Sequence, residues 1–278
     1  MTKTIWTQEE NTFLINNYSL MNVKQIMTAI NRTKWSIIAQ VRKLKLKKGY
    51  LDSNYLNSKK YNFNEYFFEK IDTPEKAYWY GFIWADGNIY NNRLTINLAV
   101  KDIDVLHNFN KSICGNYPVK YIPSKNGCTI GVTSHKMREH LHRINILPNK
   151  TYLENEPIIS DNIFIYFLLG LFDGDGCFYN RFTITNTKTT CSFIQKKLKE
   201  LFNIHSYIRK RKNAHAYEVS VDRKGDFIKL YHLLYQNINI FFLQRKKDKY
   251  FNFLIRKNYL ERNLPFRDDS GCKETVSH

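Results

Sequence analysis

Long apolar runs are missing from this 278-residue sequence. No stretch approaches the roughly 20 consecutive apolar residues that a membrane-spanning helix needs. The opening residues, Met1 to Trp6, do not resemble a signal peptide. There is also no basic amphipathic helix with the broad apolar face of a membrane-surface protein. We therefore expect an intracellular protein that neither crosses nor coats a membrane.

Cysteine is scarce, and its spacing carries no metal signature. The five cysteines form no Cys-x-x-Cys pair and no Cys/His cluster with the spacing of a zinc site. This pattern favours reduced cysteines, most of them in the core. The 19 Tyr and 19 Phe supply the bulk for a substantial core, in one large domain or two smaller ones.

Acidic side chains are few compared with basic ones. The chain has 43 Lys and Arg against 25 Asp and Glu, which gives a formal net charge of +18. Such an excess favours a polyanionic partner, although composition alone is equally compatible with a solvated basic surface. Residues 1–60 hold 11 basic and three acidic side chains, so much of the excess lies near the N-terminus.

The sequence of residues 1–48 predicts three short helices in a helix-turn-helix arrangement. Thr7 and Glu10 form a capping box at the start of the first helix. A second helix is expected over residues 23–30, and Thr33 should cap a third. Polar and basic residues of the third helix can read base edges or bind phosphates. We predict DNA contacts from Lys34, Ser36, Gln40, Arg42 and Lys43.

This segment resembles Myb-like and related helix-turn-helix modules, with Trp6 and Trp35 at the places of core tryptophans. The resemblance implies a DNA-binding domain, and a small helical protein-interaction domain is the alternative. Residues 49–70 are polar and rich in Tyr and Asn, which is typical of a linker. Residues 259–278 are expected to form a disordered tail.

Two nine-residue stretches read almost alike: residues 79–87, WYGFIWADG, and residues 168–176, LLGLFDGDG. In each, a small residue follows a glycine by four positions, which places both on one face of a helix. Small residues at this spacing let two helix backbones approach closely. The sequence therefore predicts two helices that pack on each other about a pseudo-twofold axis.

Asp86 and Asp175 stand at the same place in these stretches, 89 residues apart. A carboxylate at a helix C-terminus meets the negative end of the helix dipole, and two such groups side by side repel each other. A bound divalent cation would remove both penalties, and oxygen ligands suit Mg²⁺. The glycines that follow, Gly87 and Gly176, are expected to act as left-handed helix caps.

The repetition extends beyond the two helices. Residues 93–97 and 181–185 alternate apolar and polar side chains in the same way, and similar helical and strand patterns follow in both halves. The predicted fold is therefore α+β. It comprises two pseudo-twofold-related αββαββα repeats, over residues 71–154 and 155–258, that form a DNA-binding saddle, preceded by the small all-α domain of residues 1–48.

Helices should cover the apolar faces of the two sheets and leave the polar, basic faces exposed. Such faces could grip duplex DNA in its major groove, and an ordinary solvated sheet is the alternative. We predict DNA contacts from Arg93, Thr95, Asn97, Arg181, Thr183, Thr185, Arg209 and Arg211.

The two stretches resemble the paired motifs of single-chain LAGLIDADG homing endonucleases, and the similarity covers about residues 71–258. The first motif departs from the pattern, because Trp84 stands where an Asp is frequent, whereas Asp173 is present in the second. The resemblance implies a monomeric, Mg²⁺-dependent, site-specific endonuclease that cuts double-stranded DNA and leaves short 3′ overhangs. An intron RNA maturase or a DNA-binding regulator on the same scaffold is the alternative.

The resemblance also implies roles for individual residues. Two aspartates would bind catalytic metal ions, two backbone carbonyls would add ligands, and a basic residue near the end of each repeat would assist. These are Asp86 and Asp175, the carbonyls of Ala85 and Gly174, Lys150 in the first repeat, and Lys246 or Lys247 in the second. Because Trp84 corresponds to Asp173, we expect the two metal centres to be similar but not identical.

Overall fold

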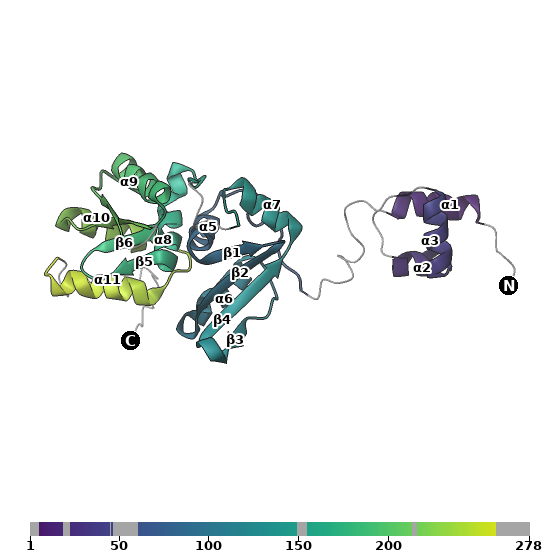
Figure 1. Cartoon of the computed structure of the whole chain (residues 1–278), viewed down its shortest axis with the longest axis horizontal. Coiled ribbons are helices and arrows are strands. Elements are labelled where there is room, and N and C mark those ends of the chain that lie inside the picture. Colours follow the sequence, from purple (N-terminus) through teal and green to yellow (C-terminus); the bar gives the residue numbers. More distant parts are fainter. Residues whose placement is uncertain are drawn as a thin grey trace, which may run out of the picture. The chain divides into compact units, whose positions relative to one another are not determined.

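The computed structural model describes residues 6–18, 23–44, 46, 61–148, 155–212 and 216–259. The chain divides into two compact units, residues 1–62 and residues 63–278 (Figure 1). Each unit has its own hydrophobic core. Among the described residues, no helix is both long and apolar enough to cross a lipid bilayer.

The N-terminal unit contains the three predicted helices. They are α1 (Gln8–Asn17), α2 (Val23–Ile30) and α3 (Lys34–Lys43). Both hydrogen bonds of the Thr7–Glu10 capping box are present, and the Thr33 hydroxyl accepts the N–H of Ser36 at the start of α3. The core of this unit is small and consists of Leu14, Ile26, Ile37 and Val41.

Two residues of α3 differ in burial from the prediction: one predicted to be in the core is exposed, and one predicted to contact DNA is buried. Trp35 is 78% exposed, so its prediction as a core tryptophan is wrong. Gln40 is buried, and its amide donates a hydrogen bond of 2.6 Å to Oδ1 of Asn11 in α1. Gln40 follows Ile37 by three positions and therefore shares its inward face. It links two helices and is not placed to read a base edge.

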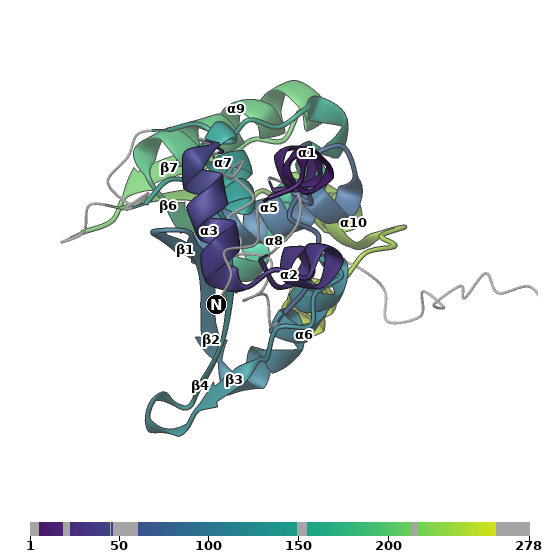
Figure 2. The same ribbon diagram turned by 90° about the vertical axis from the view of Figure 1, so that its right-hand side faces the viewer.

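The first repeat of the larger unit follows the predicted αββαββα order. Its main elements are α5 (Pro74–Asp86), β1 (Gly87–Tyr90), β2 (Arg93–Ala99), α6 (Ile103–Ser112), β3 (Lys120–Ile122), β4 (Gly127–Thr133) and α7 (His135–Arg143). Short 3₁₀ helices, Val100–Asp102 and Pro123–Lys125, complete it. The strands form an antiparallel sheet in the order β1-β2-β4-β3, and Figure 2 shows β2 and β4 running together toward β3.

The second repeat has the same order and one further helix. A 3₁₀ turn, Asp161–Ile163, precedes α8 (Phe164–Asp175), β5 (Gly176–Phe178), β6 (Phe182–Asn186), α9 (Lys188–Phe202), β7 (Tyr207–Lys210), β8 (Tyr217–Val221), α10 (Lys224–Tyr235) and α11 (Gln244–Arg256). The sheet order, β5-β6-β8-β7, matches that of the first repeat. The two-repeat α+β prediction is confirmed.

The alternation along the strands separates the two faces of each sheet as expected. Leu94 and Ile96 in β2, and Phe182 and Ile184 in β6, are buried against the helices. Polar residues of the same strands alternate with them and therefore lie on the opposite face. The helices thus cover one side of each sheet, and the polar residues lie on the other side.

The segment before α5 belongs to the larger unit and is not a linker throughout. Phe67 and Phe68 are buried in the large core, and the division between the units falls after residue 62. The rest of the predicted linker lies largely outside the described residues, because residues 47–60 are not described. The same holds for the predicted tail from residue 260 onward.

Candidate metal centre and nucleic-acid interface

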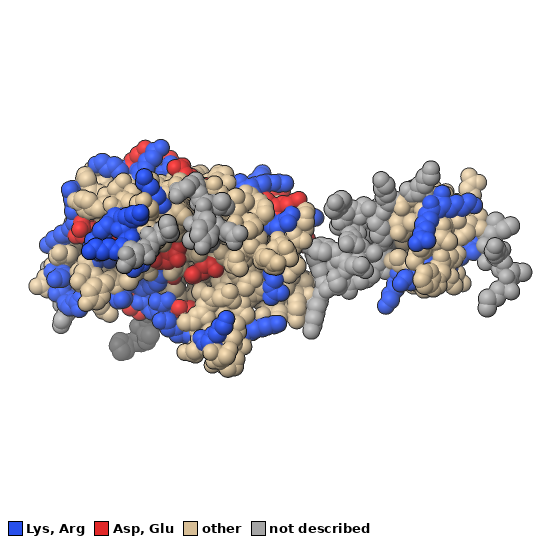
Figure 3. Space-filling view, in the orientation of Figure 1, with Lys and Arg blue, Asp and Glu red and all other residues tan. Residues whose placement is uncertain are grey.

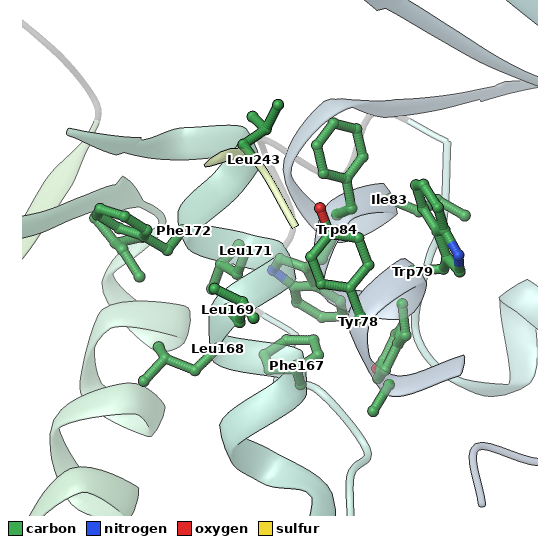
Figure 4. Packing of buried hydrophobic residues seen from close by; sticks show 14 of the residues in the cluster. Tyr78, Trp79, Ile83, Trp84, Phe167, Leu168, Leu169, Leu171, Phe172 and Leu243 are labelled. Carbon is green, nitrogen blue, oxygen red and sulfur yellow. The ribbon is translucent and has the colours of Figure 1, made fainter. Parts of the chain in front are cut away.

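Helices α5 and α8 cross with their backbones in contact. A Cβ added to Gly81 would clash with the carbonyl oxygen of Phe167, and one added to Gly170 would clash with that of Tyr78. Most of each helix is buried as well. In Figure 4, Trp79 and Ile83 point to one side of the pair, while Leu168 and Phe172 point to the other. The glycines therefore allow the two helix backbones to come into contact, and the larger side chains pack in the cores of the two repeats.

This crossing brings the ends of the two helices together. A Cβ on Gly174 would overlap the side chain of Ala85 and lie 3.2 Å from Oδ2 of Asp86. The carboxylate of Asp86 thus rests against the residue that precedes Asp175. Both aspartates end their helices and are partly exposed. The end of α5, with Asp86, therefore lies beside the end of α8, with Asp175.

Gly87 and Gly176 do not act as left-handed caps. Their backbones are extended, with φ of −72° and −77°, because each residue begins a strand directly after its helix. Glycine is required here for space, since a Cβ would strike Ile83 in the first motif and Phe172 in the second. The prediction of left-handed glycines is therefore wrong, although close approach explains the same two residues.

Asp175 has a hydrogen-bond partner that the strand pattern did not indicate. Nδ2 of Asn186, at the end of β6, donates a hydrogen bond of 2.8 Å to Oδ2 of Asp175. The Oδ1 atom of Asn186 in turn accepts the N–H of Thr187, which holds the amide in place. Alternation assigned Asn186 to the apolar face with Ile184, so the sequence did not indicate this role.

Lys246 closes the end of α8. Its Nζ donates hydrogen bonds to the carbonyl oxygens of Phe172, Asp173 and Gly176 at 2.5, 2.7 and 2.8 Å, and lies 3.4 Å from that of Gly174. A cation is favourable at the negative end of a helix dipole. The buried amine therefore adds hydrogen bonds and a positive charge at the carbonyl groups where α8 ends.

The pKa of Lys246 reflects both its burial and its acidic neighbours. Burial lowers it to about 8, and the negative charges of Asp173, Asp86 and Asp175 act in the opposite direction. The amine thus shares one electrostatic site with both motif aspartates. Lys247, the other candidate of this segment, places its Nζ over the ring of Phe242. Lys150 lies outside the described residues.

The residues that distinguish the two motifs have structural partners. Asp173 is buried, and its Oδ2 accepts the hydroxyl of Tyr78 and the N–H of Leu243, each at 2.8 Å. Burial raises the pKa of Asp173 to about 6. At the corresponding place, Nε1 of Trp84 donates to the hydroxyl of Thr190 at 3.2 Å. The surroundings of the two aspartates are therefore unequal.

The polar faces of the sheets contain most of the predicted DNA contacts. Thr95, Asn97 and Thr185 are exposed or partly exposed. The guanidinium of Arg93 lies over Gly131 of β4, where a Cβ would overlap it. Arg211 is exposed just after β7. Figure 3 shows Lys and Arg side chains over both repeats and a group of Asp and Glu side chains near the middle.

In the second repeat, an acid lies among the predicted contacts. Oε1 of Glu218 accepts from Arg209 at 3.0 Å and from Arg181 at 3.2 Å. Thr183 is buried, and its hydroxyl donates to the carbonyl oxygen of Cys177. The sequence did not identify Glu218 as a member of this face. Its carboxylate neutralises part of the local positive charge and holds the two arginines side by side.

On the N-terminal unit, the cations predicted to contact DNA are accessible. Lys34, Arg42 and Lys43 are exposed on α3, while Ser36 is half-buried and donates its N–H to the Thr33 cap. Arg32 forms an ion pair within the unit, because Nε and Nη2 of its guanidinium donate hydrogen bonds to the two carboxylate oxygens of Glu10. The basic side chains of α3 therefore remain on the surface, whereas that of Arg32 supports the fold.

Comparison with known proteins extends this description. Residues 165–237 match the family model of the LAGLIDADG-like domain. No curated protein matches the chain in sequence. Among solved structures, meganuclease I-SmaMI bound to uncleavable DNA aligns at 14% identity with a TM-score of 0.51, over 67% of this chain and 92% of that chain. The I-LtrWI LAGLIDADG homing endonuclease bound to target DNA aligns at 12% identity with a TM-score of 0.50, over 71% and 94%.

At these identities, the likeness concerns the fold alone. The two four-stranded antiparallel sheets with their helices match the two-repeat saddle of these structures. Residues 165–237 of the second repeat thus resemble the LAGLIDADG-like domain, and the two repeats together have the saddle fold of LAGLIDADG homing endonucleases.

Proposed function

We propose that this protein is a monomeric, site-specific endonuclease that hydrolyses both strands of duplex DNA and leaves short 3′ overhangs. The observation that carries the proposal is the contact between α5 and α8, which places the carboxylate of Asp86 against Gly174, next to Asp175. Two acids at one place between two polar sheets suit a reaction on both strands of a duplex. The DNA in the structures of I-SmaMI and I-LtrWI supports a DNA partner.

The donors at this place suit Mg²⁺. No group of three or more His, Cys, Asp and Glu forms a metal cluster among the described residues. Mg²⁺ needs few protein ligands, because it keeps several waters and accepts phosphate oxygens from a substrate. Asp86 and Asp175, with the carbonyls of Ala85 and Gly174, would hold the ions. When bound, the ions would activate water and stabilise the charge on the leaving oxygen.

The residues around the acids have distinct tasks in this proposal. Asn186 fixes the rotamer of Asp175 through its hydrogen bond. Lys246 supplies a positive charge at the end of α8, close enough to both aspartates for each to affect its pKa. A preorganised charge of this kind stabilises negative charge that develops during phosphodiester cleavage. We propose the same assisting role for Lys150 in the first repeat.

The duplex would lie on the polar faces of the two sheets. Arg93, Thr95 and Asn97 of β2 and Thr185 of β6 are our proposed contacts from these two strands. Arg181 and Arg209 would exchange part of their bonding to Glu218 for phosphate or base contacts. Gln40 and Thr183 are left out of this set, since both side chains are buried and hydrogen-bonded within the protein.

Substitution of the two acids tests the proposal. Asp86→Asn and Asp175→Asn keep the shape of the side chain and remove its charge, so each should abolish double-strand cleavage in Mg²⁺ and leave DNA binding intact. The substrate is a duplex that spans the insertion site of the protein's own gene. Asp104→Asn, an exposed aspartate of α6, is the matched control. Full cleavage by either motif variant would contradict the metal assignment.

The same assay separates the alternatives. A wild-type protein that leaves the duplex uncut but binds intron RNA tightly would be a maturase. One that binds duplex DNA and cuts nothing would be a regulator. We favour the nuclease because both acids are retained at the helix crossing.

A further inference from the structure

A cavity of about 870 Å³, which we call the inter-repeat cavity, is lined by residues of both repeats. The first repeat contributes the start of α5, the end of α6 and Cys114. The second contributes Tyr166 of α8 and residues 237–241, which precede α11. Because α5 has 13 residues, its first turn lies about 18 Å along the helix axis from Asp86. Cavities of this size at the boundary of two structural units are typical of ligand sites.

Contacts with a buried indole give this cavity a fixed shape. Nε1 of Trp79 donates to Oγ of Ser112 at 2.8 Å, and this hydroxyl donates to Oε1 of Glu75. The ring of Phe241 stacks on that of Trp79, with centroids 5.9 Å apart and 6° between the planes. Trp79 is fully buried. Glu75 and Phe241 belong to different repeats, and both are held in place around the same side chain.

The lining combines apolar and amide side chains. The apolar surface comes largely from Ile238, Ile240 and Phe241, all partly exposed. Three amides line the cavity as well, those of Asn108, Asn237 and Asn239. Within the described part of the chain, the side chains of Asn237 and Asn239 have no hydrogen-bond partner. An amide side chain both donates and accepts, so it can pair with the N–H and C=O groups of a peptide main chain.

The charges of the cavity indicate what kind of ligand fits. Lys111 is exposed, and among the described residues its ammonium has no ion-pair partner. Glu75 places a carboxylate in the same cavity. One cation beside one anion is a poor match for a nucleic-acid backbone, which binds clusters of Lys and Arg. A ligand with a single carboxylate and neutral polar groups suits Lys111 and the amides together.

We propose that the inter-repeat cavity binds a short peptide segment of a partner protein, with one apolar side chain and one carboxylate. The apolar side chain packs on Ile238, Ile240 and Phe241. The amides of Asn237 and Asn239 pair with the main chain of the peptide, and Lys111 binds its carboxylate. This proposal is independent of the proposed nuclease function, because it uses neither the sheets nor the two motif aspartates.

Capture of peptides by disulfide exchange tests the proposal, since the exposed thiol of Cys114 lines the cavity. The full chain with Cys177→Ser and Cys272→Ser is incubated with cysteine peptides in excess 2-mercaptoethanol, and intact-mass spectrometry measures the captured fraction. Acetyl-Cys-Gly-Leu-Glu should be captured about tenfold better than acetyl-Cys-Gly-Ser-Glu, because the leucine side chain buries apolar surface.

The matched control uses a thiol outside the cavity. Cys177 is exposed in β5 and does not line the cavity. In a chain with Cys114→Ser and Cys272→Ser, the leucine and serine peptides should be captured equally at Cys177. A preference found only at Cys114 therefore reports the cavity.

Two substitutions test the polar contacts. Lys111→Ala should lower capture of the Leu-Glu peptide about threefold and leave that of acetyl-Cys-Gly-Leu-Gln unchanged, because glutamine has no charge. Asn239→Ala should lower capture of both leucine peptides about threefold, because a main-chain hydrogen bond is lost. Both side chains are exposed, so the unfolding midpoint should stay the same.

Three results would overturn the proposal. Equal capture of the leucine and serine peptides at Cys114 would show that the cavity binds no apolar side chain. Capture of hexanethiol as strong as that of the leucine peptide would show that the amides recognise no main chain. Protection of Cys114 from iodoacetamide by single-stranded RNA, but not by acetyl-Ala-Gly-Leu-Glu, would assign the cavity to nucleic acid. A chain that cuts no DNA and still prefers the leucine peptide would refute the nuclease and support this inference.

Discussion

The guanidinium of Arg245, in the second repeat, forks onto the carboxylate of Asp102, in the first. Nε contacts Oδ1 and Nη2 contacts Oδ2, both at 2.7 Å. The neighbours of Arg245 are bound as well, because Leu243 donates its N–H to Asp173 and Lys246 donates to the end of α8. The first turn of α11 is thus tied to both repeats at the candidate metal centre.

Substitution of Arg245 and substitution of Asp102 should each destabilise the protein, but by different amounts. Arg245→Ala leaves the buried carboxylate of Asp102 unpaired, whereas Asp102→Ala leaves a guanidinium that is already 45% exposed. We therefore expect Arg245→Ala to cost more stability. A double-mutant cycle by urea unfolding should give a coupling energy of about 2 kcal/mol. Additive effects of the two substitutions would show that the fork contributes nothing.

The glycines at the helix crossing should not tolerate a methyl group. Gly81→Ala or Gly170→Ala forces a Cβ onto the backbone of the opposite helix, which cannot move without separating the repeats. We expect a loss of about 3 kcal/mol in unfolding free energy. Gly225→Ala is the matched control, because nothing lies within 4 Å of its Cβ position in α10 and alanine favours a helix. Equal effects at Gly81 and Gly225 would contradict the close packing.

The cap formed by Lys246 should contribute to stability as well as to the proposed reaction. Lys246→Met keeps the buried chain and removes the hydrogen bonds to the carbonyls of α8, at an expected cost of about 1.5–3 kcal/mol. Cleavage by the folded variant should also slow. Lys249→Met, an exposed residue of the same helix, is the control for thermal unfolding and for rate. A variant as stable as wild type would exclude the capping role.

The stability of the N-terminal unit should depend on pH through Glu10. The hydrogen bonds from Arg32, followed by the N–H of Thr7, lower the pKa of Glu10 from 4.5 to about 2. A carboxyl group with a depressed pKa stabilises the folded state fully above its unfolded pKa and loses this contribution as the pH falls through its folded pKa. The advantage of wild type over Glu10→Gln should therefore be complete above pH 4.5 and decline toward pH 2.

Hydrogen exchange of α1 and α3 peptides in the full chain measures this difference. Glu9→Gln changes an exposed carboxylate on the same turn and is the control. A gap between wild type and Glu10→Gln that stays constant from pH 5 to pH 2 would be inconsistent with the ion pair as the source.

Local patterns were sufficient for most of the architecture. The capping signals at Thr7 and Thr33 and the helix at residues 23–30 are found as predicted. The two errors in α3 have a local origin too. Residue type suggested a core tryptophan and a base-reading glutamine, whereas helical spacing from Ile37 places Trp35 outside and Gln40 inside. Periodicity was the better guide at both positions.

The candidate site was predicted in part. The paired Asp86 and Asp175 follow from the repeat, and the glycine spacing anticipated the contact between the helices that end in them. Asn186 was missed because it ends a strand whose alternation assigned it to the apolar face. Helix α11 was not predicted, so the burial of Lys246 and its hydrogen bonds to α8 were not anticipated either.

The sequence by itself determined the twofold repeat, the close approach of α5 and α8, and the pair of acids at their ends. These features depend on the spacing of residues within one helix or strand and on the recurrence of that pattern, both of which can be read directly from the sequence. Only the tertiary structure decided which charges meet: Arg245 with Asp102 at a separation of 143 residues, and Glu218 with Arg181 and Arg209. Long-range pairs depend on how whole elements pack, and no local periodicity encodes that.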